Sequence, residues 1–141
     1  MTQEDKALLL KDLCARLPYD TVCQVEFKRD GRYESKNMIL SGIFKDEAYF
    51  TIENGSVYSN DYKPYLFPLS SMTIEQQKEA NIFDDMDMDI LSENLGRNHR
   101  NKTNIPTATY NYIDWLNKNH FDYRGLIEKG LAIDATGLNI Y

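Results

Sequence analysis

The spacing of apolar residues at the start of the chain predicts a helix. Leucines recur at helical intervals behind a capping-box sequence that begins at Thr2, so we expect a helix from about Thr2 to Arg16. Pro18 ends this helix, because the residue before a proline is pushed out of helical geometry.

After Pro18 the pattern changes to alternation, which is typical of half-buried strands. Cys23, Val25 and Phe27 face one way, and Asp30-Gly31 predicts a tight hairpin. Further strands are expected over 37–44, 48–53 and 56–58, with a bulge or bend at Gly42. We therefore predict an α+β fold in which the N-terminal helix packs on a small, strongly bent antiparallel sheet or barrel, with short C-terminal helices.

The segment Lys63 to Pro68 is bracketed by prolines, which restricts it to an edge strand or an extended crossing segment. An edge strand offers unpaired backbone groups to another chain. We therefore predict a partner-binding surface here, with Tyr62, Tyr65 and Phe67 as contact residues.

The rest of the chain is expected to complete a single domain over 1–141, in which 1–72 form the helix and sheet. The sequence predicts a helical segment over 73–91, capped by Ser71 or Thr73, and C-terminal helices over 108–141. In the latter, Trp115 shares a buried face with its helical neighbours, Asp122 caps a second short helix, and Gly130 is a left-handed cap. Residues 92–107 are polar and non-periodic, which predicts a flexible loop.

Composition narrows the class of protein. The chain has 141 residues, 42% hydrophobic and 27% charged, which is ordinary for a soluble globular protein. Its longest apolar runs are far too short to span a bilayer, and its acidic N-terminus lacks the features of a secretory signal, so we expect a cytoplasmic protein, or a virion component. Cys14 and Cys23 have neither zinc nor redox spacing, so we expect two small buried hydrophobic residues.

No cofactor, metal site or catalytic residue is expected. His120 is followed by Asp122, which could orient an imidazole, but no nucleophile accompanies the pair. We instead expect His120 at a helix end, where its cationic form suits the helix dipole. We therefore predict that the protein is not an enzyme.

A basic run supports an alternative function. Arg97, Arg100 and Lys102 lie within six residues and are interleaved with asparagines, so they could hold phosphates while a tyrosine stacks on a base. The net charge of −6 argues against a protein whose whole surface binds nucleic acid. Binding of nucleic acid or of a nucleotide signal is therefore the second hypothesis.

The chain also resembles a group of uncharacterised small proteins from phages and mobile elements of gut anaerobes. The resemblance lies in residues 1–19, 63–73, 114–116 and 120–132, about half of the chain. An Arg often follows Tyr-Leu in that group where this chain has Phe67, so no polar role is carried over to this position. The resemblance implies a phage or prophage context and transfers no activity, cofactor or site residue. The first hypothesis is thus a non-enzymatic phage or mobile-element protein that binds a protein partner or its own copy.

Overall fold

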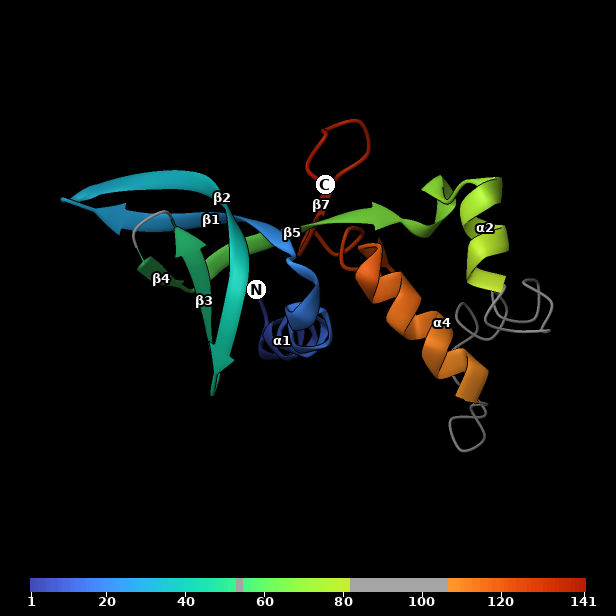
Figure 1. Cartoon of the computed structure of the whole chain (residues 1–141). Coiled ribbons are helices and arrows are strands. Elements are labelled where there is room, and N and C mark those ends of the chain that lie inside the picture. The colour runs from blue at the N-terminus through green and yellow to red at the C-terminus, as the bar shows by residue number, and fades with distance from the viewer. Residues whose placement is uncertain (53–54, 82–106) are drawn as a thin grey trace.

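The computed structural model describes residues 1–52, 55–81 and 107–141 (Figure 1). It has an N-terminal helix, a seven-stranded sheet and short helices in the C-terminal half, which confirms the predicted α+β class. The strand order is β4-β3-β2-β1-β5-β6, with β7 also paired to β5. Two of the pairings are parallel, so the sheet is mixed, and over the described residues it does not close into a barrel.

Helix α1 (Gln3–Arg16) begins at the predicted capping box. The backbone N–H of Asp5 donates to Thr2 Oγ1 at 3.0 Å, and the Thr2 N–H donates back to the Asp5 carboxylate. The 3-10 turn η1 (Leu17–Tyr19) holds Pro18, so the helix ends where the proline requires. Cys14 on this helix is exposed whereas Cys23 is buried, so the prediction that both are buried is wrong for Cys14.

Strands β1 (Val22–Arg29), β2 (Arg32–Phe44), β3 (Glu47–Ile52) and β4 (Gly55–Ser59) form an antiparallel meander. The β1–β2 hairpin turns at Asp30 and Gly31, both with positive φ, as the sequence predicts. The β2–β3 register shifts between Leu40 and Gly42, which confirms the predicted bulge.

Strand β5 (Asp61–Pro68) crosses between two parts of the sheet, which agrees with the second of the two predicted alternatives, an extended crossing segment, and it is not a free edge strand along its whole length. Its first half pairs with β1, and its second half pairs in parallel with β6 (Phe121–Asp122) and β7 (Ile133–Asp134). The prolines are tolerated because Pro64 marks the end of the β1 pairing and Pro68 is the last residue of the strand. Figure 1 shows β5 crossing from the meander towards α2 and α4.

The helices of the C-terminal half are α2 (Ile74–Asn81) and α4 (Thr107–Lys118), and a 3-10 turn η2 (Leu69–Ser71) precedes α2. Thr73 rather than Ser71 caps α2, since its hydroxyl accepts the Gln76 N–H at 3.1 Å. The segment after Asp122 forms successive turns instead of a second helix. Gly130 has a φ of 72°, the left-handed geometry expected for it. Most of the predicted segments over 73–91 and 92–107 lie outside the described residues.

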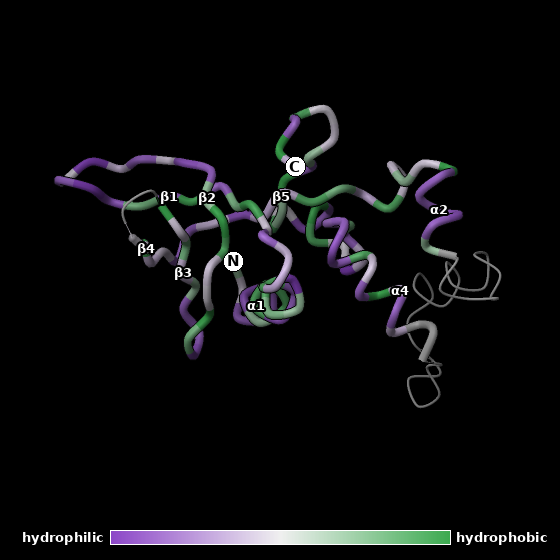
Figure 2. The backbone as a smooth tube through the Cα atoms, viewed as in Figure 1, coloured by the Kyte–Doolittle hydropathy of each residue, from purple (hydrophilic) through white to green (hydrophobic). Residues whose placement is uncertain are grey.

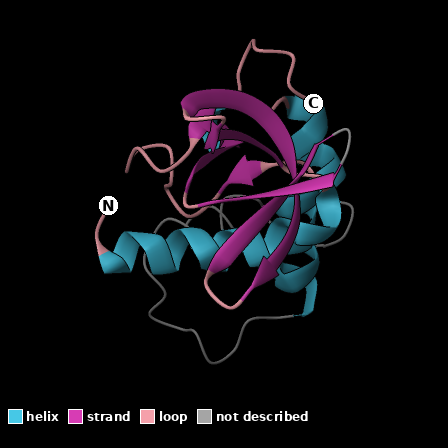
Figure 3. Ribbon diagram, turned by 90° about the vertical axis from the view of Figure 1, so that its left-hand side faces the viewer, coloured by secondary structure: helices cyan, strands magenta, loops and turns pink. Residues whose placement is uncertain are grey.

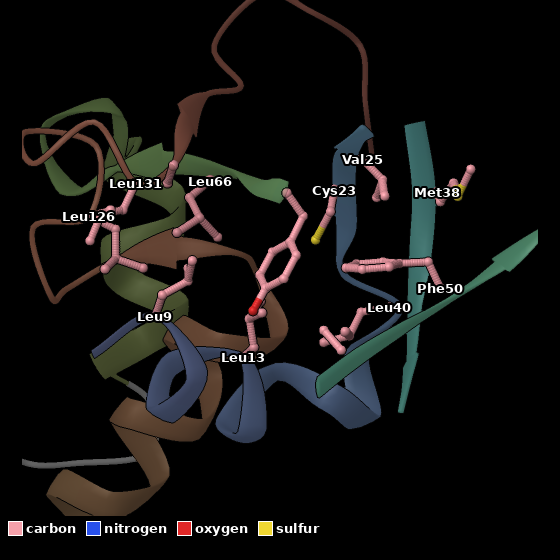
Figure 4. Close-up of a cluster of buried hydrophobic side chains, with 13 residues drawn as sticks. Leu9, Leu13, Cys23, Val25, Met38, Leu40, Phe50, Leu66, Leu126 and Leu131 are labelled. Atoms are coloured by element: carbon pink, nitrogen blue, oxygen red, sulfur yellow. The ribbon is translucent and has the colours of Figure 1, made fainter. Parts of the chain in front are cut away.

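Strand β5 contributes to two apolar clusters, with Tyr62 and Leu66 in the larger one and Phe67 packed against the smaller one. The larger one joins α1 to the meander and includes Leu9, Leu13, Phe50 and Leu66 (Figure 4). Figure 3 shows α1 running alongside the curled strands that it covers. The smaller cluster joins α2, α4 and β6 around Trp115, which is 5% exposed. No described helix is long and apolar enough to cross a membrane.

Candidate interaction surface

The tyrosines predicted to contact a partner are core residues. Tyr62 is 6% exposed and packs on Phe50, with ring centroids 5.2 Å apart, and burial raises the pKa of its phenol to about 12. Tyr65 is also buried, and its hydroxyl donates to Asn37 Oδ1 at 2.9 Å. The expectation that both rings lie at an exposed edge does not agree with this burial, which follows from the packing of Tyr62 in the larger apolar cluster and from the contact of Tyr65 with β2.

The remaining predicted contact residues are placed differently. Phe67 is half-buried, and its ring lies 6.0 Å from the rings of Phe121 and Tyr141. The basic residues Arg97, Arg100 and Lys102 lie outside the described residues. Among the described residues, Tyr62, Tyr65 and Phe67 therefore do not form one exposed surface.

Strand β4 is an open edge of the sheet. It pairs with β3, and no other strand among the described residues pairs with its second side, which we call the β4 edge. Its sequence, Gly-Ser-Val-Tyr-Ser, has no charged residue and no proline. Natural sheets commonly protect an edge with charges or prolines, so the β4 edge lacks two of the usual barriers to pairing.

A second unpaired edge offers a contrast. The first half of β2 extends past the end of β3, and its residues from Arg32 to Met38 pair only with β1. Arg32, Glu34 and Lys36 alternate along this stretch, and Figure 2 shows the projecting β1–β2 arm as strongly hydrophilic. The arm therefore has the charged protection that β4 lacks.

An aromatic pair lies beside the β4 edge. Tyr58 is 43% exposed and lies directly opposite Tyr49 on β3, with ring centroids 5.8 Å apart and a tilt of 44°. The Tyr49 hydroxyl donates to Glu47 Oε2 at 3.0 Å, a bond that raises the pKa of the phenol. Gly42 is the β2 partner of Tyr49, and it leaves open space where a side chain would stand. The outer face of β3 and β4 thus presents two adjacent tyrosine rings, and the side of Tyr49 next to Gly42 is open.

Carboxylates gather at the end of β4. Glu26 on β1 and Asp61 on β5 are both exposed and are Cα partners in the sheet. Ser59 fixes the end of β4 next to them, because its hydroxyl donates to the Glu26 carbonyl and accepts the Asp61 N–H. Glu47 lies at the same end, one residue before the β3 partner of Ser59. None of the three carboxylates forms an ion pair within the described residues.

A separate polar cluster is buried where α1 meets β6. Arg16 and Asp12 are fully buried, and Arg16 Nε donates to Asp12 Oδ2 at 2.7 Å. Arg16 Nη2 also donates to the Phe121 carbonyl at 2.6 Å, while Arg124 Nε lies 3.3 Å from Asp12 Oδ1. Both arginines lie over the ring of Tyr123. These contacts join α1 to the C-terminal part of the chain.

His120 and Asp122 do not form an acid–base pair in this cluster. The Asp122 carboxylate accepts backbone N–H groups from Arg124, Leu126 and Ile127, and it thereby caps the following turns. His120 follows α4 as expected, but burial, with a smaller contribution from Arg16, lowers the pKa of its imidazole to about 4. The imidazole is therefore neutral at pH 7, and the predicted cationic form is wrong.

The sequence analysis missed the residues of the candidate surface. Tyr49 and Tyr58 belong to a group of tyrosines expected around the sheet, but neither they nor Glu26 and Asp61 were predicted as site residues, because their significance depends on which strand lies at the edge. The absence of charge and proline in the predicted strand over 56–58 is a local signal, but the predicted strand over 37–44 shares it, so the signal does not single out β4. In comparisons with known proteins, no family model, no curated protein and no solved structure matches the chain.

Proposed function

We propose that the chain is a non-enzymatic protein-interaction module that binds a partner strand along the β4 edge. The observation that carries this proposal is an uncharged strand with one unpaired side, next to the exposed Tyr58 and the half-buried Tyr49 on the outer face of the sheet. A partner strand would take main-chain hydrogen bonds from β4 and place alternate side chains beside the two rings. Tyrosine suits such a surface because its apolar ring and polar hydroxyl serve partly wet contacts.

The charge distribution favours a protein over a nucleic acid at this surface. Glu26, Glu47 and Asp61 lie at one end of β4, and the chain as a whole has a net charge of −6. Phosphates would be repelled there. The resemblance to phage and mobile-element proteins suggests that the partner is a protein in the cytoplasm of the bacterial host, or a virion component. Nucleotide binding through Arg97, Arg100 and Lys102 remains the alternative, as a prediction from the sequence alone.

The test introduces the same charge on two different edges. Ser56→Lys places a charge on the exposed face of β4, whereas Tyr33→Lys places it near the tip of the β1–β2 arm, where the native ring is 81% exposed and lies opposite Lys28. Host proteins captured by the wild-type chain would be identified and their binding to each variant measured. We expect a true partner to bind the Tyr33→Lys variant normally and the Ser56→Lys variant about fivefold more weakly, since an unfavourable charge on a strand edge costs roughly 1 kcal/mol.

Hydrogen exchange would locate the contact. Those amides of residues 55–59 that point away from β3 should become protected when the partner is added, because they enter a new strand pairing. Protection confined to another part of the chain, or equal binding by both variants, would contradict the proposal.

A further inference from the structure

The occupant of the β4 edge can be specified by its size. Strand β4 has five residues, so pairing with it offers only a few main-chain hydrogen bonds and a contact far smaller than the roughly 1,600 Å² of a standard protein–protein interface. A contact of this size suits an extended segment of another protein. A second copy is disfavoured, because each copy has a net charge of −6 and the two would repel.

The charge of the occupant follows from the end of β4. Glu26 and Asp61 lie directly opposite each other, a like-charge arrangement that destabilises a sheet. Glu47 adds a third carboxylate at the same end, where it accepts the Tyr49 hydroxyl. A cationic side chain placed here would relieve the repulsion.

The aromatic pair selects the same kind of side chain. A strand paired with β4 places one side chain beside Tyr58 and the next on the same face two residues further along. A guanidinium group beside the Tyr58 and Tyr49 rings gains a cation–π contact, and the open space at Gly42 leaves Tyr49 accessible. The next side chain on the same face of the added strand extends towards Glu26 and Asp61.

We infer that the β4 edge binds an extended protein segment with arginine at alternate positions, which contact the Tyr58–Tyr49 pair and the carboxylates of Glu26, Glu47 and Asp61. The inference rests on the proposed function, since it specifies the partner of the same edge. It adds a requirement for positive charge that strand pairing alone does not impose.

Three short capped peptides test this requirement. Each has valine at every second position, and the remaining positions are all arginine, all glutamine or all glutamate. Binding to the full chain would be followed by the NMR shifts of the amides of residues 55–59. We expect the arginine peptide to bind about tenfold more tightly than the glutamine peptide, as one cation–π contact and one or two exposed ion pairs would give, and to weaken with added salt. The glutamate peptide should bind most weakly.

A double variant ties the preference to the named carboxylates. Glu26→Gln with Asp61→Asn should reduce the arginine-over-glutamine preference to about threefold, because surface ion pairs contribute modestly. The matched control, Glu34→Gln on the β1–β2 arm, should leave the preference unchanged.

The outcomes separate the inference from the proposed function. If all three peptides shift the β4 amides with equal affinity, the edge pairs with strands but the charge requirement is wrong. If none of them shifts these amides, both the inference and the proposed edge are wrong. A preference for arginine that survives the double variant would overturn the assignment to Glu26 and Asp61.

Discussion

The ring of Tyr141 lies against the imidazole of His120, with centroids 3.6 Å apart and an angle of 8° between the planes. The Tyr141 hydroxyl donates to the Tyr65 carbonyl at 2.8 Å and accepts the Val22 N–H at 3.1 Å. The backbone pairing of β1 with β5 ends one residue earlier, at Pro64. The phenol therefore continues the connection between these strands where their backbones no longer pair.

Removal of this hydroxyl should weaken the fold. Tyr141→Phe leaves the Val22 N–H and the Tyr65 carbonyl without their partner, so we expect a loss of about 1–2 kcal/mol in the free energy of unfolding. Urea denaturation would measure it. Tyr33→Phe is the control, because that ring is 81% exposed and its loss should stay within about 0.5 kcal/mol. Equal losses in both variants would show that the phenol bridge contributes nothing.

Trp115 should be essential for the smaller apolar cluster. Its ring stacks on Tyr112 and Phe121, with centroids 6.5 and 5.7 Å away, so Trp115→Ala should destabilise the protein by about 3–5 kcal/mol. Trp115→Phe should lose much less, because it keeps a ring and removes an indole N–H that has no partner among the described residues. Chemical denaturation of both variants would test this, and a loss under about 1 kcal/mol for alanine would contradict the core position.

Protonation of His120 should make the fold less stable in acid. The pKa of the folded imidazole is lowered to about 4 from the ordinary value of 6.5, so between these values the unfolded chain binds more protons. The contribution of His120 to the free energy of unfolding is therefore complete above about pH 6.5. It is lost as the pH falls through 4, by at most roughly 1.4 kcal/mol per pH unit.

A variant isolates this contribution. His120→Asn does not titrate, and asparagine tolerates the positive φ of 62° at this position, so its stability should depend less steeply on pH between 6.5 and 4. NMR titration of the wild-type imidazole should give a pKa near 4. An ordinary pKa near 6.5 would mean that the ring is solvated and that the stacking on Tyr141 is not maintained.

The buried pair of Asp12 and Arg16 should be sensitive to removal of either partner. Asp12→Ala leaves Arg16, which is fully buried, without its counter-charge, so we expect a loss of about 3–5 kcal/mol. Joint replacement by Asp12→Leu and Arg16→Met should lose less than either single change, because the fully buried guanidinium is removed with its carboxylate and only the partly exposed Arg124 loses its partner. Additive losses in thermal or urea unfolding would contradict this. Glu128→Ala, an exposed carboxylate, should change stability little.

The sequence correctly predicted those features of the fold that depend only on residues close together in the chain. Thr2 and Thr73 cap helices, Asp30-Gly31 forms a turn, and the bulge lies at Gly42 because each depends on neighbouring residues only. The prediction failed for features that depend on contacts between segments far apart in the sequence. Strands β6 and β7 have two residues each, too few to show alternation, so nothing in the sequence indicated that they would cover β5.

The errors in the predicted surface have the same origin. Tyr62 packs on Phe50 in the larger apolar cluster, and Tyr65 donates to Asn37, so contacts with strands distant in the sequence bury both rings. The charge state of His120 failed for a related reason, because its spacing places it at a helix end but does not reveal the burial that keeps it neutral. Burial depends on which segments meet in space.

The pairing of β5 also sets an order of events during synthesis. Its first half pairs with β1, which has already been made, whereas Tyr65 to Pro68 pair with residues 121–134. The N-terminal helix and the meander can therefore begin to assemble on the ribosome, but this apolar half-strand has no described strand partner until residues 121–134 have been synthesised. Nascent chains arrested before residue 121 should consequently be the form of this protein that aggregates and that chaperones bind.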